Sequence, residues 1–321
     1  MNERTLPPRL QTDLLSSPDE IRTGFEAMRY ICSLQVATTV YLAYHLQKPI
    51  LVEGPPGVGK TELAKTTAAY LGLPLVRLQC YEGLDESKAL YEWKYGKQLL
   101  YTQILKDQLG DVLKGAHGLA ASVERLHTFG DIFYSEEFLE PRPLLKAMRE
   151  PDGALLLIDE VDKADQEFES LLLEMLSDYQ LSIPEIGTVR AKQTPLVILT
   201  SNNTREVSDA LKRRCLHLYI PFPDAELESC IVRTQVPEVT DSLRQQLVAF
   251  IQAIRELDLK KPPAVSESID WARTLLLLHA EALDEKLVRD TLNVLLKFED
   301  DIQSVGDSLH SVLAEARKPA R

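Results

Sequence analysis

Apolar residues recur along the chain in short runs that alternate with helical patterns. Residues 30–46 carry apolar side chains at mostly helical spacing, and 60–71 is a run of good helix formers that ends at Gly72. The runs short enough for strands are bounded by turn formers or charges, and they lie at 49–54, 74–80, 154–158, 195–200 and 215–220. Strands that alternate with helices predict a parallel α/β sheet.

The pattern changes after Pro221-Phe-Pro223. From there to Leu313 the sequence is poor in glycine and carries Leu, Ile and Val at intervals of three and four residues, which predicts a second, all-helical domain. The stretch between the second and third strands is too long for a plain crossover, so it must hold an insertion. Gln180-Leu-Ser-Ile and Thr188-Val-Arg flank Pro184-Glu-Ile-Gly187, a pattern typical of a β-hairpin.

These patterns divide the chain into four parts, of which the second carries two elaborations. We expect a polar lead-in at 1–28, an α/β core at 29–223 with an insertion at about 84–150 and a hairpin at about 179–194, a helical lid domain at 224–316, and a tail at 317–321.

Composition and charge narrow the function. The 321 residues include 49 Asp and Glu against 36 Lys and Arg, which gives a net charge of −13. This charge would repel the phosphates of nucleic acid, so we do not expect a nucleic-acid partner. Four cysteines lie far apart without metal-ligand spacing, so we expect them reduced and packed as small apolar groups. No apolar run approaches the length of a membrane span and the start lacks a signal-peptide core, so we expect a cytoplasmic protein.

The strongest chemical signal is a glycine-rich turn between a predicted strand and a predicted helix. It fits the phosphate-binding pattern G-x-x-x-x-G-K-[ST] in the context that the pattern requires. Its backbone N–H groups would wrap phosphates, Lys60 would neutralise their charge, and the Thr61 hydroxyl would ligate Mg²⁺. The binding residues predicted here are Gly54, Pro55, Pro56, Gly57, Val58, Gly59, Lys60, Thr61 and Glu62.

Two carboxylates follow the buried strand at 154–158. Such a strand delivers Asp159 and Glu160 to the edge of the sheet at which ligands bind. Asp159 would hold Mg²⁺ and Glu160 would polarise the attacking water. An Asp-Glu pair in this position is by itself also typical of a helix cap, but the phosphate-binding turn upstream favours the chemical interpretation.

Three further residues are candidates for catalysis. Asn202 follows the strand at 195–200, where its amide would orient water or sense a phosphate, although a loop cap is the alternative. Arg213 and Arg214 precede the last strand, and a guanidinium there could reach a phosphate in a neighbouring subunit. The alternative for this pair is two solvated arginines.

The order of these segments resembles an AAA+ ATPase. The elaborations resemble the MoxR family within it, and four segments are similar to its CoxD-like branch. Those segments are Leu78-Gln-Cys-Tyr-Glu-Gly83, Tyr91-Glu-Trp93 with Gln98-Leu-Leu100, Leu211-Lys-Arg-Arg-Cys215 and Val265-Ser-Glu-Ser-Ile-Asp-Trp271.

The resemblance implies an ATP- and Mg²⁺-dependent remodelling chaperone. Such a protein assembles as a homo-hexameric ring and acts with a von Willebrand factor A domain partner on a client complex or metalloenzyme. The resemblance also implies that Asn202 is the first sensor. Arg213 aligns with the arginine finger that acts in trans, and Arg214 is the second candidate for that role.

One departure from the family pattern concerns the lid. The family's second sensor is an arginine at the start of a lid helix, whereas Ser266-Glu-Ser268 stands at the matching place and Arg273 follows one turn later. Either Arg273 substitutes or the lid senses nucleotide in another way.

Functions of other classes remain open from the sequence. A nucleotide-controlled binding switch would need the same Lys60 and Asp159 as a motor. A DNA-handling AAA+ motor is disfavoured by the charge and by the lack of a recognisable basic DNA-binding domain. A small-molecule kinase fits the paired carboxylates and the helical second domain less well.

Overall fold

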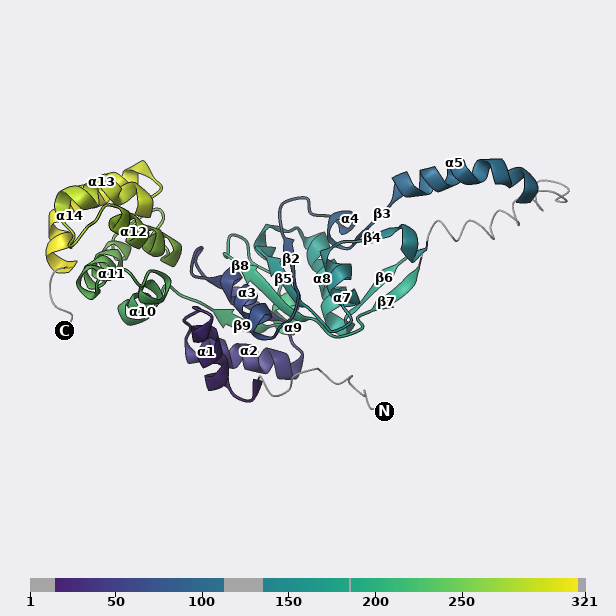
Figure 1. Cartoon of the computed structure of the whole chain (residues 1–321), viewed down its shortest axis with the longest axis horizontal. Coiled ribbons are helices and arrows are strands. Elements are labelled where there is room, and N and C mark those ends of the chain that lie inside the picture. Colours follow the sequence, from purple (N-terminus) through teal and green to yellow (C-terminus); the bar gives the residue numbers. More distant parts are fainter. Residues whose placement is uncertain (1–14, 113–134, 185, 317–321) are drawn as a thin grey trace.

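The computed structural model describes residues 15–112, 135–184 and 186–316, so the expected tail and parts of the lead-in and the insertion lie outside the described residues. A parallel five-stranded sheet in the order β2-β5-β8-β1-β9 forms the centre of the larger part of the molecule (Figure 1). Its strands are β1 (Ile50–Glu53), β2 (Leu75–Gln79), β5 (Leu155–Asp159), β8 (Leu196–Ser201) and β9 (Leu216–Tyr219). All five strands were predicted from the sequence, and so was their parallel arrangement.

Alternate residues of the central strands face opposite sides of the sheet. In β5, Leu156 and Ile158 pack into one apolar cluster, whereas Leu155 and Leu157 pack into another. Both faces are therefore covered, which explains why these strands read as continuous apolar runs rather than as alternating ones.

Helices from different parts of the sequence cover the two faces. One face carries α1 (Pro18–Ala27), α2 (Leu34–Leu46) and α3 (Lys60–Tyr70). The other face carries α7 (Pro143–Arg149), α8 (Gln166–Asp178) and α9 (Asp209–Arg214). Ser17 caps α1, and its Ile21 and Phe25 are buried against α2 and α3, so this helix within the expected lead-in packs on the core.

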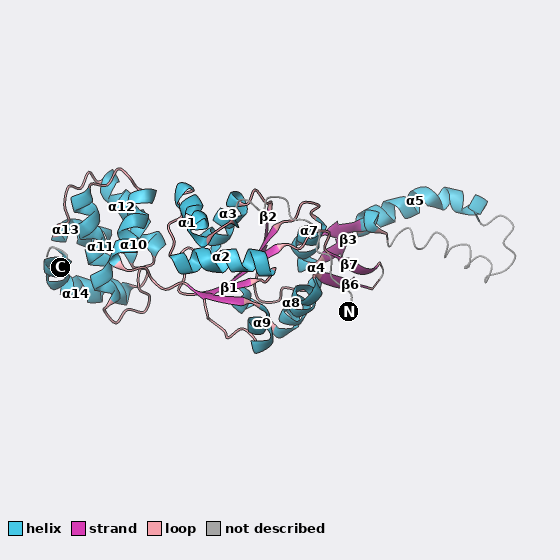
Figure 2. Cartoon of the chain, turned by 90° about the horizontal axis from the view of Figure 1, so that it is seen from below, coloured by secondary structure: helices cyan, strands magenta, loops and turns pink. Residues whose placement is uncertain are grey.

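The two elaborations of the core lie at one end of the sheet (Figure 2). Between β2 and β5 the chain forms α4 (Glu86–Ala89), β3 (Tyr91–Trp93), α5 (Tyr95–Val112), η2 (Glu136–Phe138) and β4 (Leu139–Pro141). Strands β3 and β4 pair antiparallel, and α5 extends from them away from the core. The predicted hairpin is β6 (Gln180–Ile183) with β7 (Gly187–Arg190).

The C-terminal region is helical, as predicted. It consists of α10 (Ala225–Gln235), α11 (Asp241–Arg255), α12 (Val265–Leu277), α13 (Glu285–Leu295) and α14 (Glu299–Ala316). These helices share an apolar cluster of their own around Trp271 and Phe250, separate from the two clusters of the sheet. Within the described ranges, no helix is both long and apolar enough to cross a membrane.

A buried ion pair ties this region to the segment that enters it. Glu228 of α10 is fully buried and accepts both ends of the Arg255 guanidinium, at 2.7 and 2.8 Å. The Ser268 hydroxyl donates to the same carboxylate at 2.6 Å. Arg255 also stacks over the ring of Phe222, 4.9 Å from its centroid, and Phe222 belongs to the segment between β9 and α10. One carboxylate thus fixes three helices and the chain that joins them to the sheet.

We predict that Arg255→Met lowers the free energy of unfolding by about 3 kcal/mol, because it leaves the buried Glu228 charge without its partner. Urea denaturation followed by circular dichroism measures the change. Arg289→Met is the matched control, since Arg289 pairs with Glu285 where both side chains are about half exposed, and it should change stability by less than about 0.5 kcal/mol. Equal effects of the two substitutions would contradict the role of the buried pair.

Candidate active site

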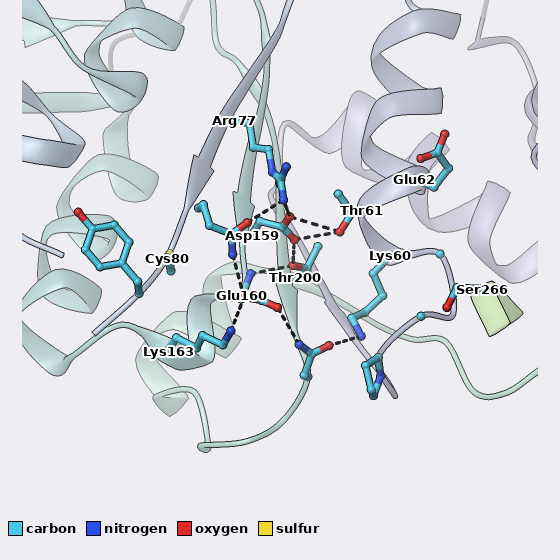
Figure 3. A pocket seen from close by; sticks show the side chains of 16 residues that line it. Lys60, Thr61, Glu62, Arg77, Cys80, Asp159, Glu160, Lys163, Thr200 and Ser266 are labelled. Carbon is cyan, nitrogen blue, oxygen red and sulfur yellow. Dashed lines mark hydrogen bonds and ion pairs between the residues drawn. The ribbon is translucent and has the colours of Figure 1, made fainter. Parts of the chain in front are cut away.

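A cavity of about 660 Å³ opens where β5, β8 and the loop before α3 meet (Figure 3). Its wall comes from the carboxyl ends of the strands, which is the edge where parallel α/β sheets bind ligands. The predicted residues Lys60, Thr61, Asp159, Glu160 and Asn202 all line it. The glycine-rich turn contributes Pro56, Gly57 and Gly59.

Lys60 lies at the centre of the phosphate-binding turn. Its ammonium group donates to the carbonyl oxygens of Gly54 and Pro55 at 2.6 and 2.7 Å, and to Asn202 Oδ1 at 2.7 Å. These contacts use all three of its donors. Burial lowers the pKa of Lys60 to about 8, although the carboxylates of Asp162, Asp159 and Glu160 pull the pKa upward. Lys60 is therefore a cation that is close to losing its proton above neutral pH.

The turn needs glycine at its first position. Gly54 has φ of +149°, and a Cβ there would lie 2.1 Å from the carbonyl oxygen of Ile220. Because that oxygen belongs to backbone, it has little freedom to move away. Close contact with the segment after β9 therefore fixes where the turn begins.

The Asp159 carboxylate is buried and completely hydrogen-bonded. Oδ1 accepts the Thr61 hydroxyl at 3.1 Å and the Thr200 hydroxyl at 2.5 Å. Oδ2 accepts two N–H groups of Arg77, Nη2 at 2.6 Å and Nε at 3.1 Å. One side chain thus joins α3, β8 and β2 at the end of β5.

Three donors hold the Glu160 carboxylate. Oε2 accepts Lys163 Nζ at 2.6 Å and Gln79 Nε2 at 2.8 Å, and Oε1 accepts Asn202 Nδ2 at 3.3 Å. Glu160 has a left-handed backbone with φ of 57°, a conformation that a residue other than glycine adopts at a cost and that occurs often at functional sites. This conformation ends β5 sharply and begins η3 (Val161–Lys163).

Asn202 connects the two halves of the cavity. Its amide oxygen accepts from Lys60 and its amide nitrogen donates to Glu160. Two buried carboxylates hold the loop that follows it. Asp162 accepts the backbone N–H and the hydroxyl of Thr204 at 3.0 and 2.6 Å, and Glu169 accepts Arg205 and the backbone N–H of Ser208. Burial opposes ionisation of Asp162, but these hydrogen bonds outweigh it and lower the pKa of its carboxyl.

The residues at Thr61 and Asp159 fit a Mg²⁺ ion. A hydroxyl and a carboxylate lie 3.1 Å apart beside the phosphate-binding turn, and oxygen donors of this kind are what Mg²⁺ prefers when phosphates complete its coordination. No cluster of three His, Cys, Asp or Glu side chains suited to a metal occurs among the residues that the structure describes. A site of this kind does not need one, since few of its ligands come from the protein.

A second cavity, of about 390 Å³, borders the phosphate-binding turn at Val58. Apolar and aromatic side chains line most of it, among them Tyr30, Ile31, Val58, Ile220 and Phe222. The predicted residue Val58 therefore faces this cavity rather than the one that contains Lys60. Its size and apolar lining suit a flat heterocycle.

Other predicted residues lie at the margin of the Lys60 cavity or outside it. Glu62 borders the cavity, but its carboxylate pairs with Lys65 at 3.0 Å. Arg213 and Arg214 line a separate groove of about 940 Å³ with Lys48 and Arg190. Within one chain, neither arginine is among the residues that line the Lys60 cavity.

The helical region reaches the first cavity through Ser266. A Cβ on Gly57, whose φ is +73°, would lie 2.6 Å from both Ser266 Oγ and Ala264 Cβ, so the start of α12 lies directly against the phosphate-binding turn. Arg273 is exposed, pairs with Asp270 and does not line the cavity. Where the family pattern expects an arginine, this chain therefore presents a serine hydroxyl.

Sequence reasoning missed the residues that support the predicted ones. Arg77, Gln79, Lys163 and Thr200 hold the two carboxylates, and no motif in the sequence assigned them this task. Arg77 and Gln79 alternate along β2, so they share one face of the strand that pairs with β5. That alternation next to the Asp-Glu strand is the signal that could have found them.

The fold and the cavity together define a nucleotide-binding protein of the P-loop class. A model of the family described as "ATPase family associated with various cellular activities (AAA)" matches residues 50–223, more than half of the chain. The chain belongs to this family.

Individual relatives add little about function. A protein of Staphylococcus haemolyticus and one of Staphylococcus aureus, both described as uncharacterised, are 26% and 25% identical over 240 residues, which is 73% of this chain and 77% of each relative. Among solved structures, the RuvB Holliday junction branch migration motor of Thermotoga maritima is 16% identical, with a TM-score of 0.45 and coverage of 88% of this chain and 73% of that chain. A mutant of the same protein reaches a TM-score of 0.48.

The lowered pKa of Lys60 predicts that nucleotide affinity depends on pH. If a charged Lys60 binds the nucleotide phosphates, affinity for ADP should stay level below pH 7.5 and fall by up to tenfold per pH unit above pH 8. The free energy of unfolding should change in the opposite direction. Because the unfolded chain holds this proton up to about pH 10.4, the penalty for burying the charge is present below pH 8 and is relieved between pH 8 and that value.

A titration of a fluorescent ADP analogue at pH values from 6.5 to 9.5 measures the affinity. Affinity that is constant to pH 9.5 would contradict the assignment of Lys60 as the titrating phosphate ligand.

Proposed function

We propose that this protein is a MoxR-type AAA+ ATPase of the CoxD-like branch, which hydrolyses ATP to remodel or mature a client protein complex. The observation that carries the proposal is the arrangement around one cavity of a phosphate-binding lysine, a threonine–aspartate pair, a second carboxylate and an asparagine. Each of these groups has a defined task in phosphoryl transfer to water.

The chain's own residues divide the work of hydrolysis. Lys60 and the N–H groups of the turn would neutralise the phosphates, and Thr61 and Asp159 would hold Mg²⁺. When bound, the ion neutralises charge that develops on the phosphate oxygens. Glu160 accepts a proton from the attacking water as its oxygen bonds to the γ-phosphorus and the bond to the ADP oxygen breaks. Asn202, which contacts both Lys60 and Glu160, orients that water against the phosphate.

The second cavity takes the nucleotide base in this proposal. Val58 lines it, and the neighbouring turn residues Gly57 and Gly59 line the Lys60 cavity, so one loop would contact both the base and the phosphates. Tyr30 and Phe222 offer aromatic surface for a purine. Residues of α10 and α12 complete the cavity, which gives nucleotide a way to act on the helical region.

Assembly as a homo-hexameric ring completes the site. Arg213 is exposed, its side chain makes no hydrogen bond with any described residue, and it lines the groove rather than the Lys60 cavity. Arg214 is engaged within the chain, where it donates to Ser177 Oγ at 2.9 Å and to the Ala210 carbonyl. The free guanidinium of Arg213 is therefore the better candidate to reach the nucleotide of a neighbouring subunit.

The partners remain those that the sequence resemblance implies, a von Willebrand factor A domain protein and a client complex or metalloenzyme in the cytoplasm. The position of α5 supports a surface for such contacts. The helix extends away from the core, and Tyr95, Leu99, Leu100 and Ile104 along it are all more than half exposed. Apolar side chains gathered in this way are uncommon on a surface that meets only water.

Glu160→Gln should reduce the rate of ATP hydrolysis by at least a hundredfold while ATP still binds, because the amide cannot accept the proton of the water. A phosphate-release assay together with binding of a fluorescent ATP analogue measures both quantities. Glu167→Gln is the matched control, since Glu167 is exposed in the first turn of α8, and it should hydrolyse at the wild-type rate.

The same variant tests the remodelling role. Because E160Q should trap ATP, it should retain its client, and affinity purification from the native lysate followed by mass spectrometry identifies what remains bound. Full client maturation by E160Q would exclude the motor hypothesis and favour a nucleotide-controlled binding switch. Recovery of neither a von Willebrand factor A domain protein nor a metalloenzyme would count against the CoxD-like assignment.

Arg213→Ala should lower hydrolysis about a thousandfold with nucleotide binding intact, and Arg214→Ala should have a much smaller effect. A mixture of Arg213→Ala with Glu160→Gln subunits should regain activity, because an Arg213→Ala subunit keeps its own Glu160 and receives Arg213 from its neighbour. The measurement is ATPase rate against mixing ratio. A mixture with no more activity than its components would contradict action in trans.

A further inference from the structure

Arg77 lines the active-site cavity, and the phosphate chemistry proposed above gives it no task. It projects from β2 into the first cavity, and its side chain is about half exposed. Two of its nitrogens contact the same oxygen, Asp159 Oδ2, at 2.6 and 3.1 Å. The Asp159 side chain is only 4% exposed, so this ion pair has one partner in water and one in the interior.

A neighbouring side chain holds the guanidinium in this position. Arg77 Nη2 also donates to Gln79 Oε1 at 2.7 Å, and Gln79 in turn donates to Glu160. A guanidinium fixed by two acceptors gives up less rotational freedom in binding the carboxylate than a loose side chain would. Gln79 thus holds Arg77 in the orientation in which it contacts Asp159 Oδ2.

The contacts of Asp159 leave no vacant oxygen for a metal ion. Thr61 and Thr200 occupy Oδ1, and Arg77 occupies Oδ2. A carboxylate offers about four acceptor positions, and five donor contacts lie within 3.3 Å of these two oxygens. Any Mg²⁺ ion or metal-bound water that uses Asp159 must take an acceptor position from one of these donors.

Charge makes Arg77 the donor that is displaced. The hydroxyls of Thr61 and Thr200 carry no net charge, so they do not repel a divalent cation that binds the carboxylate. The Arg77 guanidinium is positively charged and repels such a cation. Around the cavity, the carboxylates of Asp159, Glu160 and Asp162 are balanced by the cations Lys60, Arg77 and Lys163. Addition of a divalent ion without release of a cation would leave an excess of positive charge until phosphate arrives.

We propose that Arg77 is a positioning residue that competes with Mg²⁺ for Asp159, and so sets the Mg²⁺ concentration at which the site takes up metal with its nucleotide. The inference rests on the proposed ATPase function. Its consequence is that metal and nucleotide bind together, because nucleotide phosphates supply the negative charge that metal entry requires.

The test is a Mg²⁺ titration of nucleotide binding. A fluorescent ADP analogue is bound to the full chain in EDTA and then in rising MgCl₂, and the midpoint of the metal-dependent change is compared between variants. In R77Q the midpoint should fall about fivefold, the size expected when a half-exposed ion pair no longer competes. The affinity of R77Q for the ADP analogue in EDTA should stay within twofold of that of the wild type. A general loss of structure would instead lower this affinity.

Two further variants complete the design. Arg77→Lys keeps the charge beside Asp159 and should restore the midpoint toward the wild-type value. Arg289→Gln makes the same charge change on α13 of the helical region and should leave the midpoint unchanged. If R77Q fails to fold, Arg77→Met, which keeps the apolar stem of the side chain, serves for the same comparison.

A midpoint in R77Q that is unchanged or raised would overturn the inference, whatever the rate of hydrolysis. Failure of the wild-type chain to bind ADP would instead count against the proposed function. The two failures are therefore distinguishable in one experiment.

Discussion

The buried carboxylate of Asp159 is the interaction on which the rest of the site depends. Because it is almost inaccessible to water, its charge must be met by donors from the protein. Those donors come from three different elements, Thr61 at the start of α3, Thr200 near the end of β8 and Arg77 on β2. The single charge at the end of β5 thus requires α3 and the neighbouring strands β2 and β8 to place their donors within hydrogen-bonding distance of it.

The same requirement extends to the second carboxylate. The Thr200 hydroxyl donates to Asp159 and also accepts the backbone N–H of Glu160, so one hydroxyl holds Asp159 and also fixes the turn that carries Glu160. Asn202 lies two residues further on and joins Glu160 to Lys60. A shift of β8 would therefore disturb Asp159, Glu160 and Lys60 together.

The elements of the fold could be predicted from sequence because each has a local cause. Strands buried on both faces read as continuous apolar runs, and Gly54 is needed where backbone approaches backbone. The packing of helix α1 on the core was harder to predict, because only two of its residues, Ile21 and Phe25, are buried and the segment around them is polar. The predicted division of catalytic roles, and the ring that Arg213 would serve, remain predictions.

The sequence by itself determined the identities and order of the chemical groups, a lysine and threonine after a glycine-rich turn, two carboxylates after one strand and an asparagine after another. The spacing of these groups is local, so it can be read directly from the sequence. Only the tertiary structure decided which groups hold the carboxylates, that Arg77 shares Asp159 with Thr61, and that Arg213 lines a separate groove rather than the Lys60 cavity. The physical reason is that hydrogen bonds and ion pairs form between strands and helices that are neighbours in space. The strand order β2-β5-β8-β1-β9 sets those neighbours, and it does not follow the order of the chain.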